Sequence, residues 1–252
     1  VVYCGGSAIT NEVVRDADAL IVRTRTQCNR KLLDGSRVKF IATATIGRDH
    51  IDEKYCGEVG IAVVSAVGCN ARGVLQWVAA ALKYLLVAEG GSPEDYTLGV
   101  VGVGNVGSLV AQYARHWGFK VLECDPPRQE REGGDFVLID EIARRADIIT
   151  FHTPLNESTH HLVDARLLNM MRSNAVIINA SRGAVVDNVA IARSSHRYMF
   201  DVWENEPILD GTVLANAVLA TPHIAGYSLQ GKANATAMVV NAVASHFGLP
   251  LS

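Results

Sequence analysis

The sequence predicts an α/β protein of two lobes, the larger one built on a doubly wound parallel sheet. Short apolar segments rich in β-branched residues alternate with helix-like segments along the chain. These apolar segments show little polar alternation, which is typical of strands that helices cover on both faces. With 252 residues, of which 49% are hydrophobic, the chain is long enough to bury a core in each lobe.

Eight apolar segments are predicted strands. Two of them, residues 19–22 and 40–42, lie in the first part of the chain. The others are residues 98–102, 120–124, 147–151, 175–179, 199–202 and 218–221. About six parallel strands are enough for one doubly wound nucleotide-binding sheet, so the later part of the chain is expected to form the larger lobe.

Two long helices are expected to connect the lobes. Residues 71–89 place apolar side chains at helical spacing, and a Gly-Gly-Ser-Pro segment follows them. A second helix, over residues 230–247, would return to the first lobe. The predicted domains are therefore residues 1–72, completed by 229–252, and residues 73–228.

The charge balance favours a small-molecule partner over nucleic acid or membrane. The formal net charge of -3 provides no broad positive field for phosphate backbones or anionic lipids. The longest apolar stretch, residues 73–88, contains Gln76 and Lys83 and is shorter than the roughly 20 residues of a membrane span. We therefore interpret it as a buried helix.

The cysteines indicate a reducing compartment. They are scattered singly, without a CxxC pair and in an odd number: Cys4, Cys28, Cys56, Cys69 and Cys124. This pattern argues against a disulfide framework or a structural zinc site. The opening residues show no signal-peptide pattern, so we expect a cytoplasmic protein.

A glycine-rich turn follows the first strand of the larger lobe. Gly102, Gly104 and Gly107 have the GxGxxG spacing and precede a helix-like segment. The first glycine permits a tight turn, the second lets the backbone approach a pyrophosphate, and the third allows close helix packing. Alone this motif is weak, because glycine-rich turns occur in many α/β proteins.

The next predicted strand ends at Asp125, which strengthens the dinucleotide interpretation. Asp125 lies 18 residues after Gly107, close to the spacing of about 20 expected for a carboxylate that contacts ribose hydroxyls. A carboxylate there would repel a 2'-phosphate, so the sequence favours NAD over NADP. The alternative is that Asp125 is a turn residue before two prolines.

Three predicted strand ends carry residues suited to hydride-transfer chemistry. The segments are NASRG with Arg182, DVWENEP with Glu206, and TPHIAG with His223. Oxidation of a 2-hydroxy acid needs a base for the hydroxyl proton and a cation for the carboxylate. Ligands bind at the carboxyl ends of strands in such sheets. Singly, each residue could instead be a packed or surface group, and Glu204 could replace Glu206 as the partner of His223.

Together, GVGNVG, INASRGAVVDN, DVWENEP and TPHIAG resemble the D-isomer-specific 2-hydroxyacid dehydrogenases over nearly the whole chain. The resemblance implies a Rossmann NAD domain and a smaller flavodoxin-like substrate domain. It also implies that His223 is the proton acceptor, Glu206 its partner and Arg182 the clamp for the substrate carboxylate. TATIGRDHID, GCNARGV, CDPPR and HIAGYSLQGK are most similar to a branch of the family that oxidises 4-phospho-D-erythronate in pyridoxal phosphate biosynthesis. Phosphoglycerate is the alternative substrate.

The resemblance also implies further contacts. Those with the cofactor would come from Asn105, Val106, Thr153, Ala180, Asp201 and Gly226. Those with the substrate would come from Thr24, Thr45 and Tyr227, each of which could equally be an ordinary turn or strand-end residue. Four basic residues could neutralise a phosphate, and the sequence does not choose among them: Arg23, Arg25, Arg48 and Lys232.

Two other function classes fit parts of this pattern. A non-catalytic NAD(H) sensor, similar to corepressors of related fold, would keep the dinucleotide loop without turnover. A methyltransferase would share the fold class but leaves Arg182, Glu206 and His223 unexplained. We expect no metal, because neighbouring His160 and His161 lack a ligand spacing such as HExxH.

Two departures from the family pattern concern length. The family continues into a C-terminal dimerisation domain, so a homodimer is expected for the full-length protein. Residues 187–199 are also fewer than the helix and turn expected there, which compresses the spacing between Arg182 and Glu206.

Overall fold

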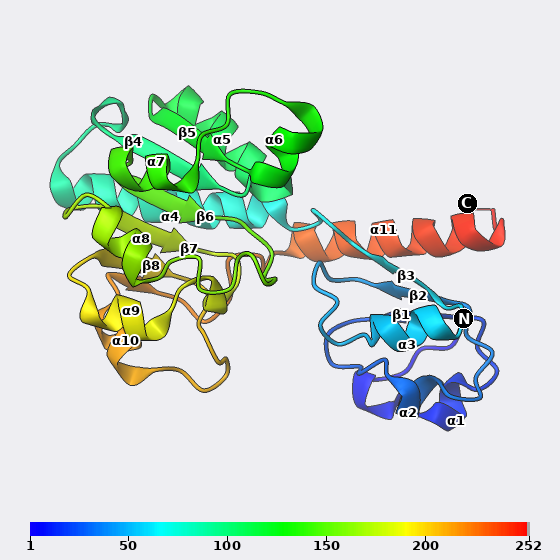
Figure 1. Ribbon diagram of the computed structural model, residues 1–252. Coiled ribbons are helices and arrows are strands. Elements are labelled where there is room, and N and C mark those ends of the chain that lie inside the picture. Colours follow the sequence, from blue (N-terminus) through cyan, green and yellow to red (C-terminus); the bar gives the residue numbers. More distant parts are fainter. Residues whose placement is uncertain (251–252) are drawn as a thin grey trace. The chain divides into compact units, whose positions relative to one another are not determined.

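The computed structural model describes residues 1–250 and divides the chain into two compact units (Figure 1). The first unit consists of Val1–Asn70 together with the chain from Tyr227 onward. The second unit is Ala71–Gly226. Each unit has its own parallel sheet, so each is described by itself.

The first unit contains a three-stranded parallel sheet in the order β1-β2-β3. Its strands are β1 (Ala19–Val22), β2 (Phe40–Thr43) and β3 (Ala62–Ser65). Its helices are η1 (Gly6–Ala8), α1 (Asn11–Val14), α2 (Arg30–Leu33), α3 (Glu53–Glu58) and α11 (Leu229–Phe247). Successive residues of β2 face opposite sides: Ile41 packs with the α1 to α3 side, and Ala42 packs against α11. β3 was not predicted from the sequence; it is a four-residue strand at the sheet edge that alternates exposed and half-buried positions.

The second unit contains the predicted doubly wound sheet, with six parallel strands in the order β5-β4-β6-β7-β8-β9. The strands are β4 (Thr97–Val101), β5 (Lys120–Cys124), β6 (Ile148–Phe151), β7 (Val176–Asn179), β8 (Arg197–Phe200) and β9 (Leu219–Ala220). Because β4 pairs with both β5 and β6, the strand order reverses there, and ligands bind at such switch points.

Helices cover both faces of the six-stranded sheet (Figure 1). They are α4 (Ala71–Glu89), η2 (Pro93–Asp95), α5 (Asn105–Trp117), α6 (Pro126–Glu132), α7 (Ile139–Arg145), α8 (Ala165–Met170), η3 (Gly183–Val185), α9 (Asn188–Arg193) and α10 (Gly211–Asn216). Neighbouring strand residues enter opposite cores: Ile177 packs with α7, α8 and α9, whereas Ile178 packs with α4 and α5. Burial on both faces explains why these strands are continuously apolar in sequence.

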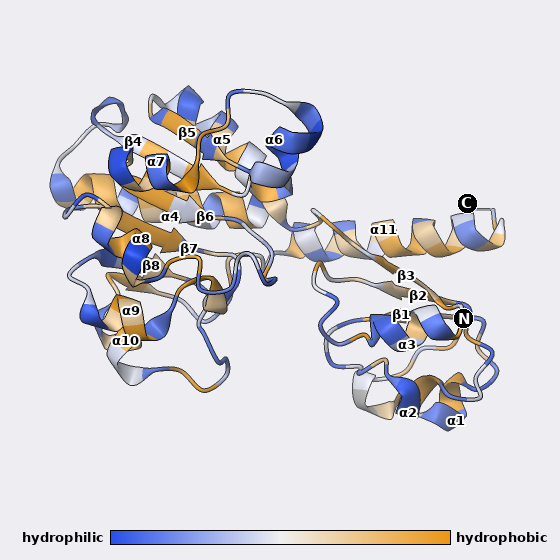
Figure 2. Ribbon diagram, viewed as in Figure 1, coloured by the Kyte–Doolittle hydropathy of each residue, from blue (hydrophilic) through white to orange (hydrophobic). Residues whose placement is uncertain are grey.

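Helix α4 is long and apolar enough to cross a membrane by length and composition. Its buried face, which includes Val78 and Leu82, packs with Leu98 and Val100 of β4 in the core of the second unit. Apolar residues also fill the strands that it covers (Figure 2). Its hydropathy is therefore that of a helix packed against a sheet, as the sequence predicted.

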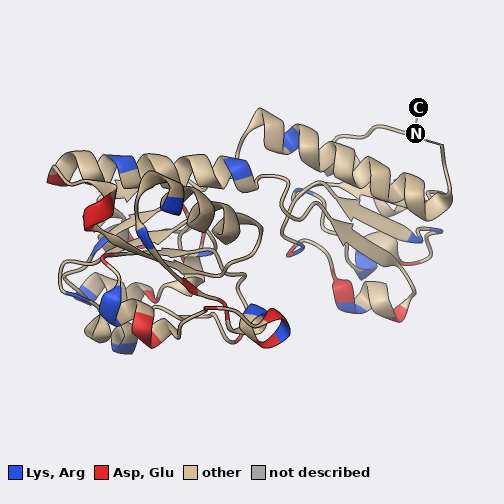
Figure 3. Cartoon of the chain, turned by 90° about the horizontal axis from the view of Figure 1, so that it is seen from above, with Lys and Arg blue, Asp and Glu red and all other residues tan. Residues whose placement is uncertain are grey.

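Charged residues of both signs are interspersed along the chain in both units, as the coloured cartoon of Figure 3 shows. Several pair within one helix or between neighbouring elements, such as Arg128 with Glu132 and Arg166 with Asp140. This mixture matches the small net charge of the sequence. All five cysteines are free thiols.

Candidate active site

The glycine-rich turn has the geometry of a dinucleotide loop. Gly102 has a φ of +84°, and a Cβ at Gly107 would lie 1.9 Å from the carbonyl oxygen of Gly102, so both positions require glycine. Gly104, by contrast, faces open space. It is the N-cap of α5 and offers no side-chain acceptor to the first amides of that helix, including those of Asn105 and Val106. Such a helix start attracts a phosphate group.

Asp125 lies beside this loop at the end of β5. Its Oδ2 accepts a hydrogen bond from the amide of Val103 at 2.7 Å, and its Oδ1 accepts one from the amide of Arg128 at 3.0 Å. The second contact caps α6, so the alternative role as a turn residue is also present. The loop and α6 border a groove of about 490 Å³ lined by Val103, Gly104, Asn105, Ser108, Leu109, Asp125, Arg128, Arg131 and Glu132.

The hydroxyl of Thr153 supports the fit of this loop to a dinucleotide. Thr153 follows β6 and lies against Gly102, where an added Cβ would come within 2.9 Å of Thr153 Cγ2. Its Oγ1 is buried and has no hydrogen-bond partner among residues 1–250. Buried hydroxyls are normally satisfied, so this oxygen is available to a ligand. Next to it, burial lowers the pKa of His152 to about 3 and keeps that imidazole neutral.

The three predicted catalytic segments follow β7, β8 and β9, which are neighbours in the sheet. His223 and Glu206 are in contact: Nδ1 of His223 lies 2.8 Å from Oε2 of Glu206. The His223 side chain is 51% exposed, so its ring remains accessible. The carboxyl ends of adjacent strands thus bring together an imidazole and a carboxylate that are separated by 17 residues in the chain.

Glu206 rather than Glu204 pairs with His223. The Oε1 of Glu206 accepts the amide N–H of Trp203 at 2.6 Å, which fixes the carboxylate. Glu204 turns to a different histidine, and its Oε1 lies 2.6 Å from Nε2 of His161. The structure therefore separates the two carboxylates that the sequence left as alternatives.

Asp201 anchors the loop that carries His223. Asp201 is 1% exposed, and its carboxylate accepts the amide N–H groups of Ile224 and Ala225, each at 2.8 Å. Thr221 Oγ1 donates to it as well, at 2.5 Å, and the carbonyl of Asp201 accepts the amide of His223 at 2.7 Å. His223 has a φ of +54°, an uncommon conformation that these bonds hold in place. In this structure the Asp201 carboxylate therefore binds groups of the protein itself, in the loop that ends at Gly226.

Arg182 lies on the loop after β7, whose shape depends on Asn179. The buried Asn179 side chain accepts from the amide of Ser181 at 3.1 Å and donates to the carbonyl of Arg182 at 2.9 Å. The Arg182 guanidinium bonds to the carbonyl of Ser181 at 2.8 Å. Ala180 is half-buried in the same loop and packs at the edge of the core that contains α4 and α5.

Trp203 contacts the loops that carry Arg182 and His223, a role that was not predicted from the sequence. A Cβ on Gly183 would lie 1.9 Å from the carbonyl carbon of Trp203, so the Arg182 loop packs directly on the Trp203 backbone. The indole N–H of Trp203 donates to the carbonyl of Thr221 at 2.9 Å. The only indication in the sequence was the position of Trp203 next to two glutamates in DVWENEP. Its contacts could not be predicted, because they involve residues distant in the sequence.

In the first unit, Thr45 belongs to a hydrogen-bond chain. The hydroxyls of Thr43 and Thr45 lie 2.6 Å apart, and Thr43 Oγ1 lies 3.0 Å from Nε2 of the buried His50. Thr45 Oγ1 also donates to the carbonyl of Gly47 at 3.0 Å. This bond leaves the Thr45 oxygen to accept from its neighbours. Thr24 is exposed in the turn after β1.

Tyr227 lies among basic side chains of the first unit. The ammonium of Lys232 is 3.6 Å from the centroid of its ring. Lys232 chiefly, with Arg23 and Arg25, lowers the pKa of the Tyr227 hydroxyl. Arg48 instead pairs with Glu53 at 2.9 Å. Of the four candidate phosphate-binding cations, Lys232 thus contacts Tyr227, and Arg23 and Arg25 act on its hydroxyl through their charge.

Sequence comparisons match this architecture. Residues 76–225 match the family model described as D-isomer specific 2-hydroxyacid dehydrogenase, NAD binding domain. Erythronate-4-phosphate dehydrogenase of Ectopseudomonas mendocina is 50% identical over 250 residues, which are 97% of this chain and 66% of that protein. Erythronate-4-phosphate dehydrogenase of Bacteroides thetaiotaomicron is 45% identical over 258 residues, covering 98% of this chain and 74% of that protein. The chain spans about two thirds to three quarters of the length of these relatives.

Solved structures share the fold. The 3-phosphoglycerate dehydrogenase of Entamoeba histolytica, with bound NAD+, matches with a TM-score of 0.82 at 24% identity and covers 98% of this chain and 84% of that one. The D-lactate dehydrogenase of Aquifex aeolicus, complexed with NAD and lactic acid, matches with a TM-score of 0.77 at 25% identity over 96% of this chain and 86% of that one. The likeness confirms the predicted α/β fold with its parallel sheet.

Proposed function

The chain belongs to the D-isomer-specific 2-hydroxyacid dehydrogenase family, and from this premise we propose that it oxidises 4-phospho-D-erythronate to the corresponding 2-oxo acid with NAD. The substrate proposal is supported by the names of the relatives, which are erythronate-4-phosphate dehydrogenases at 45–50% identity. The reaction would serve pyridoxal phosphate biosynthesis in the cytoplasm. We also propose that the full-length protein forms a homodimer, as the family resemblance implies.

The contact between His223 and Glu206 carries this proposal. Glu206 is an acceptor at Oε2, so the His223 nitrogen facing it, Nδ1, is the one that holds a proton in the neutral ring. The other nitrogen, Nε2, is then an unprotonated acceptor on an accessible ring. A histidine that acts as a general base needs this tautomer, with the proton on Nδ1 and a free lone pair on Nε2.

The chemical step follows from these groups. Nε2 of His223 accepts the proton of the 2-hydroxyl, and Glu206 stabilises the imidazolium that results. The Arg182 guanidinium binds the substrate carboxylate, which it matches in a planar, two-pronged geometry. When bound, the nicotinamide supplies a hydride acceptor for the hydrogen on C2. The two electrons leave with the hydride and the proton remains on His223, so the alcohol becomes a ketone.

The two units would divide the work. Residues 73–228 would bind NAD, with Gly104, Asn105 and Val106 at the pyrophosphate and Asp125 at the ribose. Residues 1–72, completed by 229–252, would bind the substrate. Lys232, Arg23 and Arg25 belong to these residues, and their positive charge, which acts on the hydroxyl of Tyr227, is what a phosphate monoester requires.

The test is a substrate panel on the full-length protein. With NAD supplied, we expect NADH absorbance to grow with 4-phospho-D-erythronate and much less with unphosphorylated D-2-hydroxy acids or 3-phosphoglycerate. A 2-oxo acid acceptor is added in a parallel assay to recycle NADH that does not dissociate. Turnover with 3-phosphoglycerate alone would reassign the substrate. Absence of turnover on every D-2-hydroxy acid, with NAD still bound, would favour the non-catalytic sensor.

A further inference from the structure

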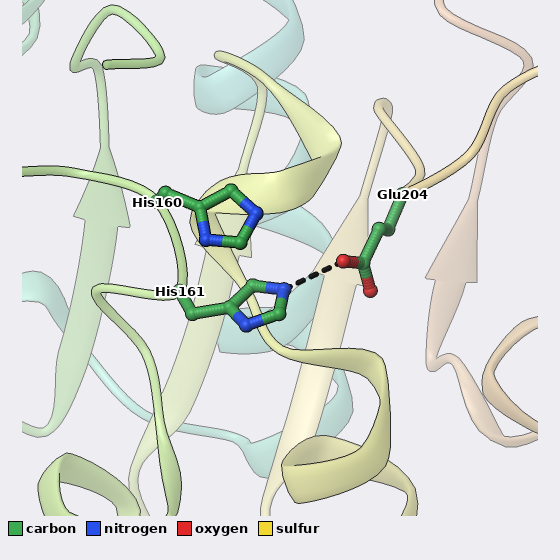
Figure 4. Close-up of side chains that lie close together, drawn as sticks. All are labelled: His160, His161 and Glu204. Carbon is green, nitrogen blue, oxygen red and sulfur yellow. Dashed lines mark hydrogen bonds and ion pairs between the residues drawn. The ribbon is translucent and has the colours of Figure 1, made fainter. Parts of the chain in front are cut away.

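We propose that His160, His161 and Glu204 form a binding site for a divalent cation of the zinc class, separate from the His223 pair. One ligand atom from each residue lies within 4.8 Å of the other two. The histidines come from the loop after β6, and Glu204 comes from the loop after β8 (Figure 4). All three belong to the second unit, and neither histidine has a role in the hydride transfer proposed above.

The backbone brings the two imidazoles to the same side. Neighbouring residues usually point in different directions, but His161 has a φ of +51°, which is uncommon for a residue other than glycine. Its ring stacks on that of His160, with centroids 3.9 Å apart. The amide of His161 donates to the carbonyl of Ala184 at 2.8 Å and holds this conformation. A left-handed residue that is not glycine is a feature that functional sites often contain.

Groups around the three residues orient them as ligands. Glu204 Oε2 accepts the amide N–H of Asn188 at 3.1 Å, which leaves Oε1 directed at His161. On the other side of the His161 ring, Nδ1 lies 4.0 Å from Oδ2 of Asp187. At this distance Asp187 makes no hydrogen bond to the ring, but its negative charge lies behind the far nitrogen of His161, on the side where metal-binding histidines commonly have a carboxylate.

The ligand set indicates which ion would bind. Two imidazole nitrogens and one carboxylate oxygen suit Zn²⁺, with bonds of about 2.0–2.2 Å and a water completing the tetrahedron. Ligand atoms around such an ion lie about 3.4 Å apart. Nε2 of His161 and Oε1 of Glu204, now 2.6 Å apart, would separate slightly as the metal replaces the proton between them. His160, which is exposed, is free to turn toward the ion.

The competing explanation is a simple hydrogen bond between His161 and Glu204 that fastens one loop to the other. That explanation accounts for His161 but assigns nothing to His160. The two explanations therefore differ in the role of His160. The variant His160→Ala removes one proposed ligand and leaves the hydrogen bond between His161 and Glu204 intact. Because His160 is exposed, the variant is expected to fold normally.

The experiment titrates Zn²⁺ into chelator-treated, NAD-free full-length protein and measures affinity by calorimetry. We expect one tight site in the wild type and at least a tenfold loss of affinity in His160→Ala. Asp187→Asn, which keeps a good N-cap for α9, should weaken binding to a smaller extent, because it removes the negative charge that lies 4.0 Å from Nδ1 of His161. Binding should also tighten as pH rises, because a proton leaves when the metal enters.

Two matched controls exclude other sites. His116→Ala removes an exposed histidine of α5 in the same unit and should leave Zn²⁺ affinity unchanged. His223→Ala should also leave it unchanged, which separates the proposed site from the pair with Glu206. Visible absorbance of Co²⁺ in place of Zn²⁺ gives a second readout, since thiolate ligation by a cysteine would add a charge-transfer band. Equal Zn²⁺ affinity in the wild type and His160→Ala, or a wild type without a tight site, would overturn the proposal.

Discussion

Nδ1 of His223 lies 2.8 Å from Oε2 of Glu206, whose other oxygen accepts the amide N–H of Trp203 at 2.6 Å. Both carboxylate oxygens therefore face donors. The Trp203 amide belongs to the backbone and its donor role is fixed, so the carboxylate is held in one orientation. The position of the proton on the His223 ring follows from that orientation.

Replacement of Glu206 by Gln leaves the Trp203 amide and the Nδ1–H of His223 with only one acceptor oxygen between them. A glutamine has one acceptor oxygen, so either the Trp203 amide or the Nδ1–H of His223 loses its partner. We expect kcat to fall by roughly 100- to 10,000-fold, the range for losing a general base, as it should in His223→Asn. The double variant should be about as slow as either single one, because residues that act as a unit are not additive. Steady-state kinetics with an unchanged Kd for NAD would check this, and an additive loss would show that the two residues act separately.

The glycine-rich turn allows folding and cofactor binding to be tested separately. Gly107→Ala would place a Cβ 1.9 Å from the Gly102 carbonyl oxygen, a backbone clash that no side-chain rotation relieves. We expect a loss of about 3 kcal/mol or more in the free energy of unfolding, measured by urea denaturation.

Gly104→Ala is the matched variant, because a Cβ there meets no atom within 4 Å. Its free energy of unfolding should stay within about 0.5 kcal/mol of the wild type. Its affinity for NAD should fall, since the new methyl group occupies the space through which a pyrophosphate approaches the backbone. Unchanged affinity for NAD in Gly104→Ala would show that the pyrophosphate does not bind at this turn.

Local pattern was sufficient to predict most of the larger sheet. Strands buried on both faces, such as β6 and β7, are continuously apolar, so they stand out in the sequence. β3 was missed because it is short, lies at an edge and has no uniform apolar character. Its pairing with β2 supplies the missing stabilisation, and that pairing is a tertiary property.

The candidate active site was also only partly predictable, because tertiary contacts hold it together. The three catalytic candidates could be named because their segments follow predicted strands, but the groups that hold them could not. Asp201 reaches the amides of Ile224 and Ala225 across more than 20 residues, and Trp203 reaches Thr221 across 18. Glu204 meets His161 across 43 residues. Sequence spacing carries no signal for such contacts, since they depend on which strands become neighbours.

Asp125→Ser tests the choice between NAD and NADP. Serine is also a good N-cap, so α6 should still begin after this position. Loss of the carboxylate removes a charged acceptor for the ribose hydroxyls, worth about 1.5–3 kcal/mol, so kcat/KM with NAD should fall roughly 10- to 100-fold. Arg128 and Arg131, which line the same groove, should then favour the 2'-phosphate of NADP. An unchanged ratio of the two kcat/KM values would show that the carboxylate does not contact the ribose.

The half-buried His152 makes the stability of the protein dependent on pH. Burial lowers its pKa from 6.5 to about 3 in the folded state, whereas in the unfolded chain it titrates near 6.5. Between these values the unfolded state binds more protons, so the free energy of unfolding decreases as pH falls. The contribution of His152 is fully present above about pH 6.5 and is lost progressively toward pH 3. By pH 5 the loss is expected to be about 1–2 kcal/mol.

His152→Gln isolates this contribution, because glutamine can still bond to the Thr150 hydroxyl that lies 3.0 Å from Nε2. Urea denaturation at pH 7 and pH 5 should show that the variant loses about 1–2 kcal/mol less stability than the wild type over this interval. Burial also lowers the pKa of His50 and His196, so part of the acid sensitivity should remain in the variant. An identical loss in both proteins would mean that His152 is already protonated, or reached by water, in the folded state.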